Sequence, residues 1–424
     1  MTAGLETRPV RGRAAKQERS ERARAAIAEG VITTLAEHGA AGLTHRRAAK
    51  ASGTSLAATT YYFATKTDMV AEASNALLQR YLEVFGKVAV QSAGEGAAAY
   101  VAFVSRVAAE GLGRDRTHML AWYEMMLDGA RDPEARDVAR SWYVQFDQMW
   151  RCLADAFSLP QAEAAARSGV DLTVGAMVHG LGLGWTPDQF TGAVMGALSA
   201  DALLGRTVEA DRHPPSTGRT RKAAQTRDRL REAAIQLLAE GGASAVTYGA
   251  VASRAGLTPA APVYHFCSVA DLLADAQRSL FEGQKARYRE VMGKAFPGLT
   301  LDMLVELTGV VFQREATEYA GLNIAGYAIW LEAARRPEVR PHVRPVMSDL
   351  YLAWRRLLNT QGVTGGGAFE AMCVQFLFVG AQIRVLAGGG GAGEVAQAET
   401  RLMNDITALA QGRHWLQATA EFSR

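Results

Sequence analysis

The amino-acid sequence predicts an all-α fold made of two tandem copies of one helical unit. Alanine and glycine are abundant, and apolar residues recur with helical rather than alternating spacing. Segments also repeat at a near-constant offset: "LAEHGA" (35–40) returns as "LAEGGA" (238–243), and "TYYF" (60–63) returns as "VYHF" (263–266). The repeated unit has about 200 residues, which is long enough for each copy to form its own domain.

The later part of the unit repeats as well. "YEMMLDGARDPEAR" (123–136) resembles "YAIWLEAARRPEVR" (327–340), and Trp150 and Trp354 keep the same offset. Between the copies, prolines, Ser216 and Gly218 predict a linker. The predicted parts are a basic N-terminal arm (1–18), a three-helix domain (19–66), a helical domain (67–207), a linker (208–221), a second three-helix domain (222–269) and a second helical domain (270–424).

Within the first copy the helices can be placed in order. Periodic apolar residues over 19–38 predict a helix that Gly39 ends. Thr44 and Ser55 are suited to cap two short helices, over 44–51 and 55–62, with Gly53 between them. Further helices are expected over 67–85, 133–150, 171–184 and 190–204.

Composition restricts the class of protein. The net charge is only +3, so charge alone does not indicate a nucleic-acid partner. Three widely spaced cysteines have no metal-ligand spacing and indicate a reducing compartment. The longest apolar run, 371–383, is shorter than a membrane span, and the basic N-terminus lacks the apolar core of a secretory signal. We therefore expect a cytoplasmic protein with no membrane partner, no metal and no cofactor.

A helix, a short helix, a glycine turn and another short helix form a helix-turn-helix arrangement. The run "LTHRRAAKASGTSLAATTYYFATKTDMVAEA" (43–73) resembles the DNA-binding segment of the tetracycline-repressor (TetR) family. The resemblance covers 19–73 well and 222–280 less well. It implies that each copy is a TetR-like unit, with a helix-turn-helix domain followed by a helical ligand-binding and dimerisation domain.

The residue types of the first copy fit contacts with double-stranded DNA. Hydroxyl groups, cations and the capped start of the third helix suit phosphates, while small and apolar side chains suit groove walls and thymine methyls. Arg46 is our candidate for a bidentate guanine contact. The basic arm either reaches a minor groove or is a solvated tail. The predicted DNA contacts are Thr44, Arg46, Arg47, Ser55, Leu56, Ala57, Thr59, Thr60, Tyr61 and Lys66.

The second copy departs from this pattern. Gly249 and Val269 stand where the first copy has Arg46 and Lys66, and Pro262 falls inside the expected third helix. Because cations dominate affinity for DNA, we expect the second copy to keep the fold but to bind DNA weakly or not at all. The alternative is an asymmetric operator, which the arginines of 219–231 favour. The predicted weak second site is Thr258, Tyr264 and His265.

The resemblance also implies a ligand cavity in the helical domains. Aromatic and methionine residues there suit either a pocket or a core, and the scarcity of charges favours a small apolar or weakly polar effector. The candidates are Trp122, Tyr123, Met126, Met177 and His179 in the first copy, and Tyr327, Trp330 and Gln375 in the second.

The sequence therefore predicts a ligand-released transcriptional repressor rather than an enzyme, since it contains no phosphate loop and no nucleophile elbow. The alternative function is a small-molecule-binding or interaction protein with a vestigial helix-turn-helix. Two assemblies remain open: the copies pair within one chain as a pseudo-dimer, or two chains form a homodimer that places two N-terminal readers on a palindrome.

Overall fold

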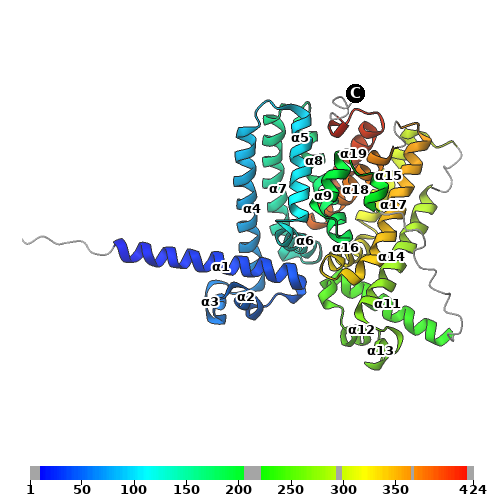
Figure 1. Ribbon diagram of the computed structural model, residues 1–424. Helices are drawn as coiled ribbons and strands as arrows, with labels where there is room; N and C mark the ends of the chain where they lie inside the picture. The colour runs from blue at the N-terminus through cyan, green and yellow to red at the C-terminus, as the bar shows by residue number, and fades with distance from the viewer. Residues whose placement is uncertain (1–9, 205–220, 293–297, 364–366, 418–424) are drawn as a thin grey trace, which may run out of the picture.

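The computed structural model describes residues 10–204, 221–292, 298–363 and 367–417, and every regular element in these ranges is a helix. The predicted all-α fold is confirmed. The first unit occupies one side of the molecule and the second unit the other (Figure 1). Most of the predicted linker lies outside the described residues.

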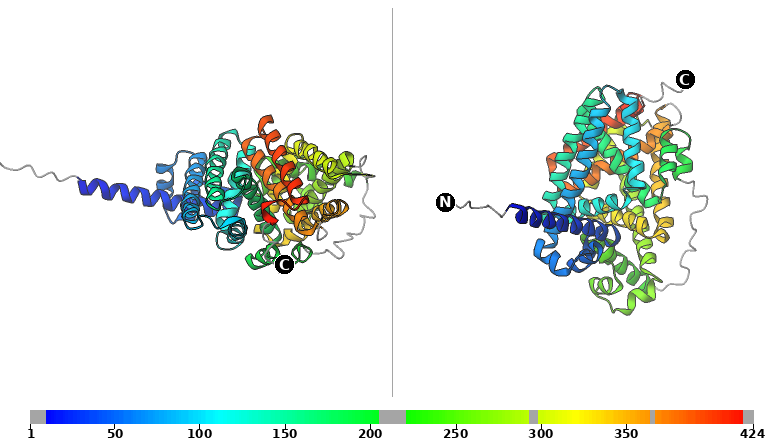
Figure 2. Two further views of the ribbon diagram at one scale, coloured as in Figure 1. Left: turned by 90° about the horizontal axis from the view of Figure 1, so that it is seen from above. Right: turned by 60° about the vertical axis from the view of Figure 1, so that its left-hand side comes forward.

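The expected helices of the first unit are found in the predicted order, but α5 and α6 were not expected and α8 begins earlier than predicted. Helix α1 begins earlier than expected and continues past Gly39, whose φ of 67° and ψ of 176° kink it. The arginines at 11, 13 and 19 therefore lie in a helix, which extends away from the body of the molecule (Figure 2). The expected helix over 190–204 is divided into α9 and α10. The elements are α1 (Val10–Gly42), α2 (His45–Ser52), α3 (Leu56–Tyr62), α4 (Lys66–Gln91), α5 (Gly96–Leu112), α6 (Arg116–Arg131), α7 (Pro133–Ala156), α8 (Ala162–Leu183), α9 (Pro187–Val194) and α10 (Ala200–Leu204).

The second unit repeats this order. Its elements are α11 (Arg221–Gly241), η1 (Ala243–Ala245), α12 (Tyr248–Arg254), α13 (Ala260–His265), α14 (Val269–Met292), α15 (Leu301–Ala316), α16 (Ala320–Arg335), η2 (Pro337–Val339), α17 (Arg340–Thr360), α18 (Ala368–Gly388) and α19 (Ala392–Ala410).

The short helices of the first unit begin at the expected caps. The hydroxyl of Thr44 accepts a hydrogen bond from the Arg47 amide at 3.2 Å, and that of Ser55 accepts one from the Ala58 amide at 3.1 Å. Gly53 ends α2 in the left-handed conformation, with φ of 66°. These caps satisfy amides that a helix start would otherwise leave unpaired.

Pro262 of the second copy lies inside its third helix, as expected, and does not disturb it. Helix α13 begins at Ala260, after Pro259 rather than Thr258, so Pro262 is only its third residue. The first-turn amides of a helix have no intrahelical acceptor, and a proline there loses no bond. The carbonyl of Pro262 still accepts from the Phe266 amide at 2.9 Å, so the turn closes normally.

The two units pack against each other through α8 and α18. A Cβ placed on Gly175 would lie 1.8 Å from the Phe376 carbonyl oxygen, and one on Gly380 would lie 1.8 Å from that of Asp171. Each glycine therefore lies against the residue four positions before the other, which is the reciprocity of a two-fold axis. The units pair within the chain as in a dimer.

Helix α18 is long and apolar enough to cross a membrane, but its apolar window is 100% buried inside the protein. It carries Arg384, which binds Asp171 of α8 at 2.7 Å and Asp147 of α7 at 2.8 Å. Helix α18 is therefore a core helix: its apolar residues are covered by protein and its one cation in this stretch is paired. Its length and composition do not indicate a membrane protein.

Candidate DNA interface and ligand cavity

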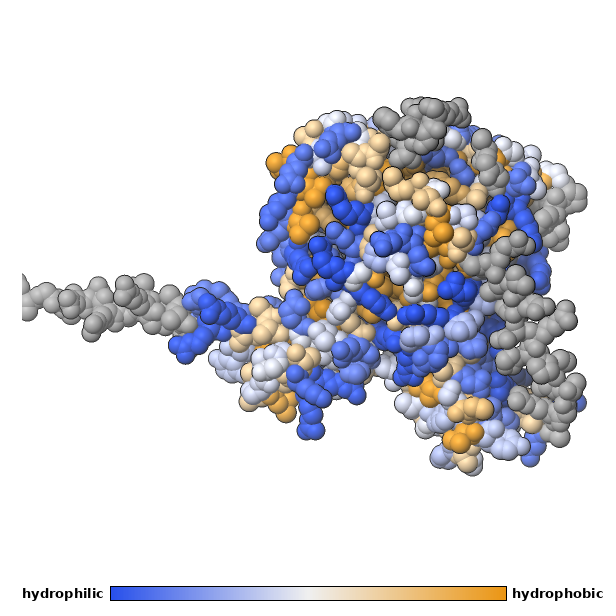
Figure 3. Space-filling model, in the orientation of Figure 1, coloured by the Kyte–Doolittle hydropathy of each residue, from blue (hydrophilic) through white to orange (hydrophobic). Residues whose placement is uncertain are grey.

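The two helix-turn-helix segments lie at the same end of the molecule. Figure 1 shows α2 and α3 at the lower left and α12 and α13 at the lower right, both on the side away from the described C-terminal residues. In Figure 3, hydrophilic side chains project from the lower edge of the first three-helix domain, whereas a hydrophobic patch lies at the lower tip of the second. The two readers therefore offer different surfaces in the same direction.

The first reader offers cations on an open surface. Arg46 and Lys50 of α2 are exposed, and among the described residues neither forms a recorded ion pair. Arg47 is also exposed, but its guanidinium donates to the Gly42 carbonyl at 2.6 Å and so holds the end of α1. Other predicted contacts are exposed as well: Thr44, Ser55, Leu56, Ala57, Thr60 and Tyr61, the last with 80% of its surface accessible.

Two of the predicted DNA contacts, Thr59 and Lys66, are not fully exposed. Thr59 is fully buried and its hydroxyl donates to the Leu56 carbonyl at 2.8 Å, so it does not face DNA. It lies on the inner side of α3, where a seven-residue helix needs anchoring. Lys66 is half-buried at the start of α4. Burial raises the pKa of Asp128 on α6, and the nearby charge of Lys66 partly opposes this rise.

Two arginines of α11 are used inside the second unit. Arg227 donates to the His265 carbonyl at 2.6 Å, pairs with Asp275 at 3.0 Å, and stacks 4.1 Å from the centre of the Phe266 ring. Arg229 donates to the Ala255 carbonyl. These two cations hold the second three-helix domain together, whereas Arg221 and Lys222 at the start of α11 are exposed and keep the asymmetric operator as an alternative.

The face of α12 and α13 carries little charge. Arg254 pairs with Glu240 through two bonds of 2.6 and 2.8 Å. Of the predicted weak site, Tyr264 is 83% exposed, Thr258 is exposed and His265 is half-buried. This surface can touch a DNA backbone through hydroxyl groups, but it contributes little electrostatic attraction.

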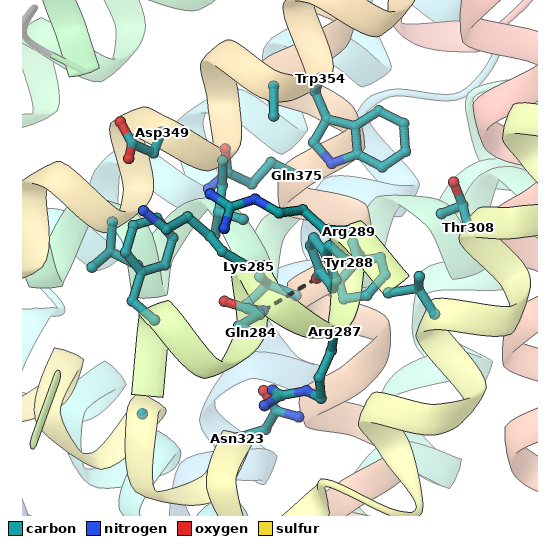
Figure 4. A pocket seen from close by; sticks show the side chains of 18 of the residues that line it. Gln284, Lys285, Arg287, Tyr288, Arg289, Thr308, Asn323, Asp349, Trp354 and Gln375 are labelled. Atoms are coloured by element: carbon teal, nitrogen blue, oxygen red, sulfur yellow. Dashed lines mark hydrogen bonds between the residues drawn. The ribbon is translucent and has the colours of Figure 1, made fainter. Parts of the chain in front are cut away.

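A cavity of about 660 Å³ lies within the second unit, between α14, α15, α16, α17 and α18 (Figure 4). This is the size of a site for a drug-sized molecule. Tyr327, Trp330 and Gln375, which the sequence analysis selected, line it. The sequence analysis missed Gln277, Gln284, Gly326 and Gln382, among others.

The equivalent space in the first unit is filled by aromatic rings. At the repeat offset, Trp122 corresponds to Gly326, Trp142 to Val346 and Phe146 to Leu350. The rings of Trp142 and Phe146 lie 4.4 Å apart, and those of Trp122 and Trp142 lie 5.4 Å apart. The first-unit candidates are therefore core residues and do not line the cavity, because these large rings occupy the volume that smaller residues leave open in the second unit. This corrects the prediction that four buried residues of the first unit line a ligand pocket: Trp122, Tyr123, Met126 and Met177.

Comparison with known families agrees with this architecture. The family model described as "Tetracyclin repressor-like, C-terminal domain" matches residues 91–210 and 299–408, more than half of the chain. The model described as "Bacterial regulatory proteins, tetR family" matches residues 230–276. The chain belongs to the TetR family. It is a DNA-binding transcriptional regulator with a repeated C-terminal domain, and no curated protein matches it.

The N-terminal TetR match falls on the second copy, whereas the sequence analysis found the better resemblance in the first. The second copy keeps the Thr247 cap of α12, the turn glycine Gly256 and the buried Phe266 of a TetR helix-turn-helix, although its α13 has no side-chain cap. The second copy therefore matches the N-terminal family model, whereas the first copy carries the exposed cations of α2.

His179 connects the two halves of this TetR protein. Its ring is fully buried on α8, and burial lowers its pKa to about 4. Nδ1 lies 2.7 Å from the Gly175 carbonyl, to which it must donate, so Nε2 accepts from the Gln375 amide at 3.0 Å. His179 does not line the cavity, but it fixes the orientation of Gln375, which does.

Two arginines cross from one TetR-like unit to the other. Arg335, at the end of α16, donates to the Ala36 carbonyl at 2.7 Å and the Leu35 carbonyl at 3.2 Å, in the last turn of α1 before its kink. Arg131, at the end of α6, makes the equivalent bonds to Ala239 at 3.1 Å and Leu238 at 3.4 Å. Each unit therefore caps the first helix of the other unit's reader.

The crossed contact on the first reader is the stronger one. Arg335 also pairs with Glu124 of α6 at 2.7 Å, and the other oxygen of Glu124 accepts from the Ala40 amide at 3.2 Å. Burial raises the pKa of Glu124, but Arg335 and Arg131 outweigh burial and bring it below its usual range. The carboxylate is therefore ionised, and it joins α6, α16 and α1 in one buried network.

Proposed function

We propose that this chain is a single-chain pseudo-dimeric repressor that reads its operator mainly with the first helix-turn-helix and is released by a small molecule in the second unit. The observation that carries the proposal is that the DNA-binding cations and the ligand cavity lie in different units. Helix α2 carries two exposed cations, Arg46 and Lys50, that form no ion pair with the described residues, and the cavity is between α14 and α18. The second reader positions the chain on DNA and adds little affinity.

Because reader and cavity belong to different units, the proposal needs a path between them. Helix α16 supplies one, since Tyr327 and Trp330 line the cavity and Arg335 follows five residues after Trp330. A ligand that displaces α16 also displaces the guanidinium that caps α1 of the first reader. The ligand then favours a conformation in which the reader no longer fits its site.

Operator binding can be tested with DNA from beside the chain's own gene. Arg46→Ala should weaken binding by about tenfold or more, because an arginine–guanine contact contributes about 1–3 kcal/mol. The matched change in the second unit, Tyr264→Ala, should weaken binding by less than about threefold, as expected for a single uncharged backbone contact. Equal losses from the two variants would contradict the assignment of the reader.

Salt dependence separates the proposal from its alternative. A regulator that neutralises phosphates loses affinity steeply as salt rises. A small-molecule-binding protein with a vestigial helix-turn-helix would bind none of this DNA at any salt concentration. Absence of binding across the salt series would therefore favour the alternative function.

A further inference from the structure

We infer that the cavity of the second unit binds one neutral, flat aromatic molecule per chain, and that this molecule carries both hydrogen-bond donors and acceptors. The inference names the ligand class for the release step proposed above and rests on that function only for its regulatory consequence. Three features of the described residues carry it: unpartnered polar atoms, neutral interior walls, and aromatic rings around them.

The first feature is a set of buried polar atoms that have no partner. Gln277 Oε1, Gln382 Nε2 and Trp330 Nε1 all belong to cavity-lining side chains, and none has a hydrogen-bond partner among the described residues. Gln277 is 3% exposed and Gln382 is 2% exposed. Tyr327 donates to the other end of the Gln382 amide, so Oε1 is occupied and the NH₂ group remains free.

Each of these atoms is covered in the present conformation, so a ligand pairs with it only after the side chain rotates towards the cavity. An unpartnered buried polar atom costs about 1–3 kcal/mol, and a ligand that pairs with it recovers this energy. Gln277 offers an acceptor, whereas Gln382 and Trp330 offer donors. A complementary ligand therefore needs at least one hydroxyl or amine N–H, together with carbonyl or similar acceptors. A pure hydrocarbon would leave all three atoms unpaired.

The second feature is the neutrality of the inner walls. Arg287 is paired with Glu315 through bonds of 2.7 and 3.0 Å, and Asn323 donates to the same carboxylate at 2.8 Å. The other charged lining residues are either paired or exposed. Lys285 pairs with Glu282 at 2.6 Å, and Arg289, Arg356 and Asp349 are exposed; Lys285, Arg289 and Asp349 are labelled in Figure 4. A charged ligand would therefore find no free counter-charge among the buried lining residues, and burying an unpaired charge is costly.

The third feature is the aromatic character of the walls. Phe281, Trp330, Trp354 and Phe378 line the cavity, and such rings favour offset or edge-on contact with another ring. Gly326 provides the space, since nothing lies within 4 Å of a Cβ placed there. Because Trp122 occupies the corresponding position of the first unit, the equivalent space there has no room for the ligand.

The ligand class can be tested with four flat three-ring probes of similar size: danthron (a neutral dihydroxyanthraquinone), anthraquinone sulfonate (an anion), proflavine (a cation) and phenanthrene (a hydrocarbon). Binding to the full chain is measured by tryptophan quenching and by calorimetry. We expect danthron to bind most tightly and to saturate at one molecule per chain. Tighter binding of a charged probe or of phenanthrene, saturation at two, or binding of none of them would overturn the inference.

Variants locate the site. Gln382→Leu should weaken danthron by about tenfold, since one donor is lost. Gln145→Leu, a change at a half-buried position of α7 in the first unit, should leave binding unchanged. Gly326→Trp should abolish binding by restoring the first unit's plug, and Gln382→Leu still decides the question if that variant fails to fold. Unchanged affinity in Gln382→Leu would overturn the assignment of the site.

Release from operator DNA is measured separately with the same probe. Danthron binding that follows these variants, but leaves the operator complex intact, would count against ligand-controlled repression and would leave the ligand class standing. The two proposals therefore fail by different outcomes.

Discussion

Replacing Arg335 by leucine should destabilise the first reader far more than its exposure suggests. The side chain is 10% exposed, and its partner Glu124 is 5% exposed. Without the Arg335 guanidinium, the buried carboxylate of Glu124 would have Arg131 as its nearby cation, and Arg131 forms no direct ion pair with it among the described contacts. Breaking a buried pair from one side costs about 3–5 kcal/mol. The carbonyls of Leu35 and Ala36 would also lose their charged donor.

The neighbouring arginine is a matched control. Arg336 pairs with Glu332 at 2.7 Å, but it is 50% exposed, and Glu332 keeps Arg335 at 3.5 Å when Arg336 is removed, so Arg336→Leu should cost no more than about 1 kcal/mol. The double variant Arg335→Leu/Glu124→Leu removes both charges, and it should be more stable than Arg335→Leu alone. Stability is measured by urea unfolding, followed by circular dichroism, with operator affinity measured on each variant in parallel.

One set of results would refute this reasoning. If Arg335→Leu and Arg336→Leu lose the same free energy of unfolding, the crossed contact carries no special weight. If Arg335→Leu is destabilised but binds the operator and responds to ligand as the wild type does, the path through α16 is wrong. A restored stability in the double variant, with altered operator affinity, is the outcome that the network requires.

The remaining predictions concern the interface, pH and DNA. Gly175→Ala should disrupt the pairing of the units and cost more than about 3 kcal/mol, because its Cβ would collide with the Phe376 carbonyl, whereas Gly249→Ala, with open space around it, should be neutral or slightly stabilising in thermal unfolding. Burial lowers the pKa of His179 to about 4 from 6.5, so the unfolded chain binds the proton first and stability is lost as pH falls from 6.5 towards 4. At about pH 5 this loss is about 2 kcal/mol, and His179→Gln should lack it when urea unfolding is compared at pH 7 and pH 5. Lys50→Ala should reduce the slope of operator affinity against salt by about one, and an unchanged slope would show that this exposed cation does not meet a phosphate.

The sequence alone was sufficient for the short helices of the first reader and their caps, because these depend on local residue types, but it did not place α5 or α6. Thr44 and Ser55 cap the helices that were expected from them, and Gly53 ends the helix before it. The inward orientation of Thr59 was not predictable, since it depends on which side of a seven-residue helix meets the domain. The place of Pro262 depended on a one-residue choice of helix start, which local patterns do not fix.

The sequence predicted that a ligand cavity exists, but only the candidate residues of the second unit line it. Aromatic residues selected in both copies proved to line a cavity in one and to fill the core of the other. The difference was present in the sequence, in the pairing of Trp122 with Gly326 and of Trp142 with Val346, but it becomes visible only when volumes are compared at the repeat offset. The crossed arginines could not have been found this way, because sequence does not reveal which unit a side chain reaches.

The fused chain explains how such a division could arise. In a homodimer every substitution appears twice, so a tryptophan at position 122 would close both cavities and the loss of Arg46 would disable both readers. Here each copy changes alone: Trp122 fills one cavity while Gly326 keeps the other open, and Gly249 stands in one reader while Arg46 remains in the other. A ligand in one half can control a reader in the other only if the halves are coupled, and the bonds from Arg335 to Leu35 and Ala36 cross between the units at the required place.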